Sequence, residues 1–217
     1  MNKARLEAFS DGVFAIIITI MVLEIKVPHG EDWSSLKPLL PVMMSYVLSF
    51  AFVGIYWVNH HHLLHTSNKV NSAILWSNIH LLFWLSLVPV ATDWMGETHF
   101  ASHPVAVYAT LLLLCGVAFT ILQTQLKKKN NNSEKLQHAF KMLEKKGIFS
   151  ILAYTTALVF AFLNTTVSGC LFLLVALVWF IPDKNIERAL SSEWINFRYG
   201  PYAHYKKCFQ TYPAQQQ

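Results

Sequence analysis

Charged residues are scarce in this chain of 217 residues, which has 13% Asp, Glu, Lys and Arg where a soluble domain usually carries about 25%. Hydrophobic residues make up 54% of the chain, and they fall into long runs. This composition excludes an ordinary soluble domain and indicates a protein embedded in a membrane.

Cysteines and cleavage signals are equally sparse. Cys115, Cys170 and Cys208 are scattered and form no CxxC motif, so they predict neither a disulfide framework nor a redox site. The first apolar run is preceded by Arg5 and Asp11, and no small-residue cleavage site follows it. We therefore expect no cleavable signal peptide and a first helix that is retained.

The sequence predicts six membrane spans. Four of them have the roughly 20 apolar residues that a spanning helix needs, and the last two are shorter and form a hairpin. The four single spans and the hairpin are predicted at about 9–27, 41–64, 70–92, 104–126 and 148–181, the hairpin turning at 164–169. The predicted fold class is an all-α integral membrane protein with six transmembrane helices per subunit. Residues 1–183 form this unit, and residues 184–217 form an aromatic, amphipathic cytoplasmic tail.

The distribution of basic residues predicts the orientation. With a cytoplasmic N-terminus, fifteen Lys and Arg fall on the inner side, and only Lys26 and Lys37 fall on the outer side. This asymmetry follows the positive-inside rule and predicts that both termini are cytoplasmic. It also assigns the basic residues to topology and to anionic lipid rather than to nucleic acid, which we exclude as a partner.

The basic loop between the fourth and fifth spans carries one further signal. From Ser133 it predicts a short amphipathic helix, because Leu136, Phe140 and Leu143 share one face.

The first apolar helix contains a narrow stripe within "RLEAFSDGVFAIIITIMVLEI", residues 5–25. Its members lie at i, i+3, i+4 and i+7: Ile16, Thr19, Ile20 and Leu23. Spacing alone leaves two interpretations open. The stripe packs against a neighbouring helix, or it lines a pore as an apolar constriction with one layer of hydroxyl groups.

Ionisable residues near this helix need partners. A charge such as Asp11 in an apolar segment is costly, so we expect it to face protein, water or a cation. Four histidines crowd the end of the second span, among them His61 and His65 at a spacing that suits a metal. No Cys, Asp or Glu nearby completes such a site, so we predict no metal and expect these histidines to bond to Asp11, Arg5 or carbonyl groups.

Two polar residues, Asn78 and His80, lie inside the third apolar span. We predict that both make hydrogen bonds to other helices, since an unpaired polar group in a membrane is costly.

The first helix resembles the signature of the FSD-motif potassium channels, which comprise the lysosomal potassium channel of animals and its bacterial homologues. The matching residues are Arg5, then Phe9, Ser10 and Asp11 after a gap of three, followed by "GVFAI" and a closing "LEI". "YWVNHHHLL" on the second span and the stretch 78–89 on the third also match, so the resemblance covers residues 5–92.

The resemblance implies a fold and a function. A single six-helix unit is similar to the bacterial members, which implies a homotetramer in a bacterial inner membrane with the first helix around a central pore. Potassium would be the permeant ion, with no cofactor, no enzymatic activity and no TVGYG filter. By resemblance, Ile16 would form the narrow constriction, Ile20 and Leu23 would continue it, and Thr19 would supply the hydroxyl layer tied to potassium preference.

The family signature also implies a bracing network on the cytoplasmic side of the pore helix. Its residues would be Arg5, Phe9, Ser10 and Asp11, joined by a histidine of the second helix. Three adjacent histidines leave that partner open between His60 and His61.

The sequence leaves three alternatives to a channel. A secondary transporter of a small cation would favour broken helices in corresponding halves, and the sequence shows no such symmetry. A membrane enzyme or metal protein would need a carboxylate or thiol near the histidines. A purely structural oligomer would tolerate Ile16→Asn without a change in ion flux. For a channel, histidines at the inner mouth predict a flux that depends on pH, because imidazoles change charge between about pH 5 and 8.

Overall fold

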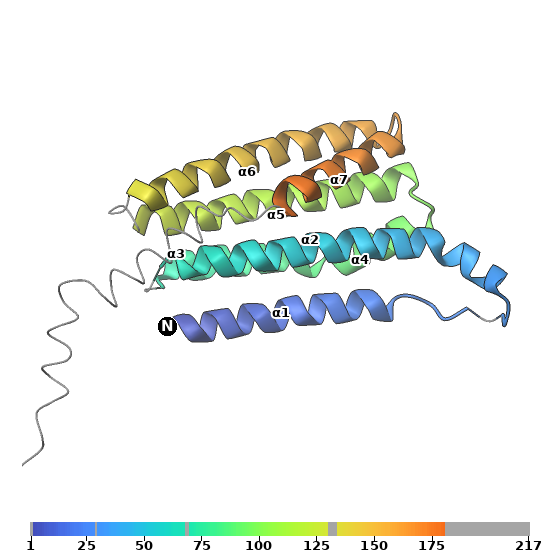
Figure 1. The fold of residues 1–217 in the computed structure, drawn as a ribbon, viewed down its shortest axis with the longest axis horizontal. Coiled ribbons are helices and arrows are strands. Elements are labelled where there is room, and N and C mark those ends of the chain that lie inside the picture. The colour runs from blue at the N-terminus through green and yellow to red at the C-terminus, as the bar shows by residue number, and fades with distance from the viewer. Residues whose placement is uncertain (1, 29, 68–69, 130–133, 181–217) are drawn as a thin grey trace, which may run out of the picture.

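The computed structural model describes residues 2–28, 30–67, 70–129 and 134–180, and the regular secondary structure of this part of the chain is helical, without strands. The helices lie along one long axis as an elongated bundle (Figure 1). In chain order they are α1 (Lys3–Leu23), the 3-10 helix η1 (Trp33–Leu39), α2 (Leu40–His65), α3 (Ser72–Ser86), α4 (Val88–Glu97), α5 (Ser102–Lys129), α6 (Glu134–Phe160) and α7 (Thr165–Phe180).

The lengths and compositions of these helices fit a membrane. Four stretches are long and apolar enough to span one: Lys3–Leu23, Trp33–His65, Ser72–Glu97 and Ser102–Lys128. The apolar second half of α6 and the shorter apolar helix α7 form the predicted hairpin (Figure 1). The predicted all-α, multi-pass membrane fold is confirmed. The predicted tail, residues 184–217, lies outside the described residues.

The third span is divided where the sequence predicted one helix ending near residue 92. α3 ends at Ser86, Leu87 is the junction, and α4 continues to Glu97. Pro89 explains the break, because a proline cannot donate a backbone hydrogen bond and is tolerated in the first turn of a helix. The proline therefore starts a helix here instead of ending one.

The hairpin turn occupies residues 161–164, just before the predicted 164–169. Asn164 Oδ1 accepts a hydrogen bond from the backbone N–H of Thr166 at 3.0 Å, at the start of α7. Ser168 Oγ donates to the carbonyl oxygen of Ala157 on α6 at 2.8 Å. Asn164 therefore ends the turn and caps α7, while Ser168 attaches α7 to α6 from within the helix.

The expected short amphipathic helix and the fifth span form one continuous helix, α6. The predicted apolar face is buried, with Leu136, Phe140 and Leu143 at most 3% exposed. Beside this face, Gln123 Nε2 of α5 donates to the Phe140 carbonyl at 3.2 Å. Packing against α5 extends the helix because it buries apolar surface that a free segment would leave in water.

Hydroxyl groups join α2, α4 and α5 inside the bundle. Thr92 Oγ1 donates to Ser49 Oγ at 2.7 Å, and Ser49 Oγ lies 2.8 Å from the Tyr108 hydroxyl. Such bonds hold membrane helices together where apolar surface is no driving force. Beyond α1, Lys26 donates a hydrogen bond to Glu97 of α4, and this bond raises the pKa of Lys26.

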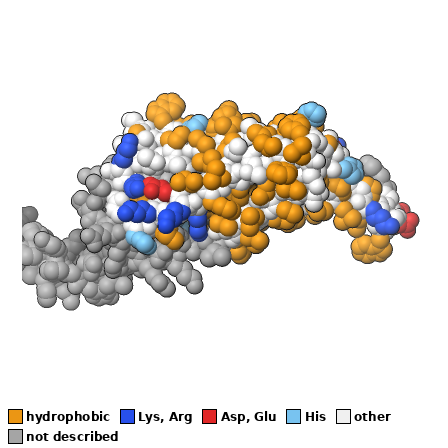
Figure 2. Space-filling view, turned by 90° about the horizontal axis from the view of Figure 1, so that it is seen from above, with side chains coloured by type: hydrophobic (Ala, Val, Ile, Leu, Met, Phe, Trp, Pro, Cys, Tyr) orange, Lys and Arg blue, Asp and Glu red, His pale blue; other side chains and the backbone are white. Residues whose placement is uncertain are grey.

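Charged and apolar side chains are separated along the bundle. Hydrophobic side chains cover its middle, and most of the Lys and Arg in view gather at one end (Figure 2). In Figure 1 this is the end at which the N-terminus lies, and α2 and α5 also run to it. The first helix therefore starts at the basic end of the bundle.

Candidate functional site

Helix α1 has one packed face and one bare face. Its buried residues follow helical spacing and point to α2, α3 and α4: Leu6, Ser10, Phe14, Ile17 and Met21. On the other side, the predicted stripe is uncovered, with Ile16 58% exposed, Ile20 40% and Leu23 79%.

The bare stripe contains a single hydroxyl group, that of Thr19. Thr19 Oγ1 donates to the carbonyl oxygen of Ile16, one turn earlier, at 2.9 Å. Donating in this way satisfies the proton and leaves the oxygen lone pairs free to accept. Arg5, Phe9 and Gly12 are also exposed, and their spacing from Ile16 continues the stripe toward the N-terminus.

A buried chain of polar side chains fixes the packed face. Asn78 Nδ2 of α3 donates to Ser10 Oγ of α1 at 3.0 Å, and Asn78 Oδ1 lies 2.6 Å from His60 Nε2 of α2. Ser10 and Asn78 are 0% exposed and His60 is 1% exposed. The chain joins three helices through one asparagine, so it sets the rotation of α1 and directs the stripe away from the bundle.

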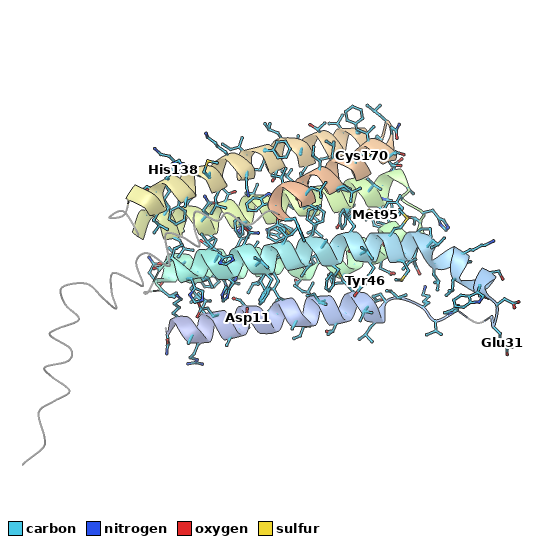
Figure 3. All side chains as sticks on the ribbon, viewed as in Figure 1. Asp11, Glu31, Tyr46, Met95, His138 and Cys170 are labelled. Carbon is cyan, nitrogen blue, oxygen red and sulfur yellow. The ribbon has the colours of Figure 1, made fainter. Side chains whose placement is uncertain are left out.

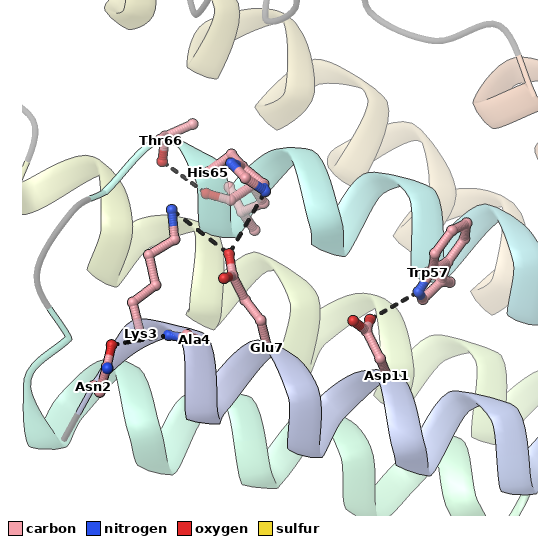
Figure 4. A network of polar contacts seen from close by, with 9 residues as sticks. Asn2, Lys3, Ala4, Glu7, Asp11, Trp57, His65 and Thr66 are labelled. Atoms are coloured by element: carbon pink, nitrogen blue, oxygen red, sulfur yellow. Dashed lines mark hydrogen bonds and ion pairs between the residues drawn. The ribbon is translucent and has the colours of Figure 1, made fainter.

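The second polar contact of the signature involves Asp11, which lies on the N-terminal half of α1 (Figure 3). Asp11 Oδ1 accepts a hydrogen bond from the indole Nε1 of Trp57 on α2 at 2.9 Å (Figure 4). The sequence predicted a histidine as partner for Arg5 and Asp11. Within the described residues no hydrogen bond joins either one to a histidine, and Arg5 is exposed.

Glu7 connects the two helices closer to the N-terminus. Its Oε1 lies 3.6 Å from Lys3 Nζ and 3.7 Å from His65 Nε2 (Figure 4). Sequence reasoning missed Glu7 and Trp57. One signal was present for each: Lys3 and Glu7 have the i, i+4 spacing of a helical ion pair, and Trp57 lies three residues before His60 on one helix face.

Within the described residues, His61 and His80 form no hydrogen bond to another helix, although the sequence predicted one. The His61 and His65 rings lie 4.4 Å apart between centroids, and in the described part of the chain no three His, Cys, Asp or Glu residues are placed to hold a metal ion. His80 is exposed and accepts from the indole Nε1 of Trp84 at 2.9 Å within α3. Its partner lies one turn away on the same helix, and no hydrogen bond joins His80 to another of the described helices.

The bundle is that of a multi-pass helical membrane protein. Its first helix carries a candidate site, with one face fixed by hydrogen bonds and the other face exposed. A protein-family model described as the endosomal/lysosomal potassium channel TMEM175 matches residues 5–89. A potassium channel of Chryseobacterium sp. (strain P1-3) is 52% identical over 190 residues, which are 88% of this chain and 98% of that protein. The chain belongs to the TMEM175 family.

Two further relatives extend the comparison. The crystal structure of a lysosomal potassium-selective channel TMEM175 homologue from Chamaesiphon minutus matches with a TM-score of 0.71 and 31% identity, over 82% of this chain and 95% of that one. The human endosomal/lysosomal proton channel TMEM175 is 31% identical over 135 residues, which are 54% of this chain and 26% of the human protein.

Proposed function

We propose that the protein is a potassium-permeable cation channel, assembled as a homotetramer with α1 around a central pore. The observation that carries this proposal is the bare stripe of α1, opposite a face locked by Ser10. Relatives that share most of their length with this chain are named potassium channels, and one solved relative is named potassium-selective.

In the proposed pore, four copies of α1 present rings of the same side chains. A ring of Ile16 narrows the pore with apolar surface, and such constrictions can gate by expelling water. Ile20 and Leu23 continue the apolar lining. The Thr19 side chains of the four subunits offer four hydroxyl oxygens, one helical turn from the constriction, to a cation that has lost part of its water.

In the proposed channel, the polar contacts of α1 with α2 and α3 act as braces. Asn78 of α3 donates a hydrogen bond to Ser10 on the packed face of α1. Trp57 of α2 donates one to Asp11, the next residue of α1. Because both bonds lie on the side away from the stripe, they resist rotation of α1 without entering the pore.

The proposed orientation places both termini in the cytoplasm of a bacterium, with the chain in the inner membrane. The fifteen inner basic residues support it through the positive-inside rule. On this side, anionic lipid headgroups would contact exposed lysines of the adjoining helix ends, such as Lys128 of α5 and Lys141 of α6.

The direct test is ion flux from liposomes that contain the purified protein. Vesicles loaded with potassium and diluted into sodium medium develop a potential only if potassium passes, and a protonophore then reports it as proton uptake. The same vesicles without protonophore report proton permeation, the activity named in the human relative. Potassium flux with a four-subunit mass supports the proposal. Substrate-coupled, saturable transport would favour the transporter, and an impermeable tetramer whose stripe variants are also impermeable would favour a structural oligomer.

A further inference from the structure

A small cavity lies behind α2, on the side away from α1. It is partly open, is lined by α2, α5, α6 and the end of α7, and has a volume of about 20 Å³. Tyr56 and Asn59 line it from α2, Gly116 from α5 and Tyr154 from α6. None of the residues that line it is charged.

The cavity contains hydrogen-bonding groups that the protein does not use. In the described part of the chain, the hydroxyls of Tyr56 and Tyr154 make no hydrogen bond to the protein, and both tyrosines line the cavity. Asn59 donates its Nδ2 to the Ile55 carbonyl at 2.8 Å, which leaves its amide oxygen free to accept. Unpaired polar groups are costly in a membrane interior, so this set indicates a guest with a polar end.

A glycine provides the space for that guest. A Cβ atom built on Gly116 would lie 3.9 Å from Tyr154 Cε2 and 3.9 Å from the Tyr56 hydroxyl. The volume of the cavity is enough for one or two water-sized groups, which matches a hydroxyl and not a phosphate headgroup.

An apolar groove of about 480 Å³ lies beside the cavity, between α2 and α7, and Ile55 lines both. The groove is lined only by apolar side chains, including Met44 and Val47 of α2 and Leu173 and Leu177 of α7. A polar, uncharged pocket next to an apolar groove suits an amphiphile with one alkyl chain and a small neutral head.

We propose that this is a binding site for an uncharged single-chain amphiphile of the long-chain alcohol class, which enters from the membrane. Its hydroxyl bonds to Tyr56, Tyr154 and Asn59, and its chain lies along the groove. The site is separate from the stripe of α1. A guest there would touch the turn of α2 that also carries Trp57, which holds Asp11.

Photolabelling of the intact protein in liposomes tests the site. The probe is an octanol derivative with a diazirine, followed by mass spectrometry of the adducts. We expect adducts on peptides that contain Tyr56, Tyr154 or Trp179, and an excess of unlabelled octanol should reduce them several-fold. Adducts spread over all lipid-facing helices, or adducts that octanol does not displace, would overturn the proposal.

Two variants sharpen the test. Gly116→Val fills the cavity, and Gly169→Val is its control because a Cβ built on Gly169 meets nothing within 4 Å. Labelling should fall several-fold in the first and persist in the second; equal labelling contradicts the site. If Gly116→Val does not assemble, Tyr154→Phe removes one hydroxyl without adding volume and should also reduce labelling. The measurement needs no ion flux, so its failure is independent of the proposed channel activity.

Discussion

At the residue scale, the first helix separates polar groups that are paired from a hydroxyl that is available. In the core, Asn78 forms hydrogen bonds to both Ser10 and His60, and both residues would lose a partner if the asparagine were removed. Thr19 instead faces out of the subunit. The same helix therefore carries a structural polar site and a candidate functional one, on opposite faces.

Replacing the central asparagine tests the structural site. Asn78→Ala leaves the buried Ser10 and His60 side chains without their shared partner, which should cost about 1–3 kcal/mol of stability. Thermal unfolding of the purified protein in detergent measures the loss. His80→Ala is the control, because His80 is exposed on the same helix and, among the described residues, its hydrogen bond is to Trp84 of that helix. Equal unfolding temperatures for both variants would contradict the bracing role.

Removing the exposed hydroxyl tests the candidate functional site. Thr19→Val keeps the shape of the side chain and removes its oxygen, so the preference of the flux for potassium over sodium should fall. The control is Thr156→Val on α6, an exposed threonine that also donates to its own helix, at 2.8 Å to the Leu152 carbonyl. An unchanged preference in Thr19→Val would remove Thr19 from the selectivity layer.

At the element scale, the close approach of α4 to α2 holds the two halves of the third span in place. Gly96 permits this contact, because a Cβ built on it would lie 2.8 Å from Val42 Cα and 2.5 Å from Ser45 Oγ. The backbone of α2 cannot give way to it as a flexible side chain could.

Gly96→Ala should therefore lower stability, since overpacking typically costs about 1–3 kcal/mol and outweighs the gain in helix propensity. Gly54→Ala is the matched control, because its Cβ would meet nothing within 4 Å and the same change should be neutral or stabilising. Urea or thermal unfolding compares the two. A Gly96→Ala protein as stable as Gly54→Ala would show that α4 can shift.

The membrane-spanning segments were predictable, because each long apolar run must satisfy its backbone polar groups within a helix. The break at Leu87 and the continuity of α6 were not, because local sequence permits either outcome there. Pro89 is compatible with the start or the end of a helix, and the contact of Gln123 with Phe140 depends on tertiary packing. The exposed stripe of α1 followed from spacing, but the choice between packing and pore lining rested on the family resemblance.

At the scale of the whole molecule, helix packing determines which histidine of α2 joins the buried hydrogen-bond chain with Asn78. His60 and its two neighbours point in successive directions around α2, and only the position of Asn78 on α3 selects His60. The sequence left His60 and His61 open for this reason. His65 lies at the same end beside Glu7, in a position to respond to pH.

Potassium flux should depend on pH between about 5.5 and 8, where histidines change charge. Protonated His65 would pair with Glu7 and tie α2 to α1, while the nearby Lys3, His61 and His62 oppose that protonation. We expect a smaller pH response in His65→Gln, measured by liposome flux at each pH. A flat profile in the unmodified protein would remove this prediction.

The most direct test of the pore assignment is potassium flux from liposomes that contain the unmodified protein or Ile16→Asn. Leu152→Asn is the control, since Leu152 is 63% exposed on α6, away from α1. If Ile16 forms the constriction, Ile16→Asn raises flux or weakens potassium preference, and Leu152→Asn behaves like the unmodified protein. Unchanged flux and preference in an intact Ile16→Asn tetramer would contradict the assignment and return the stripe to helix packing.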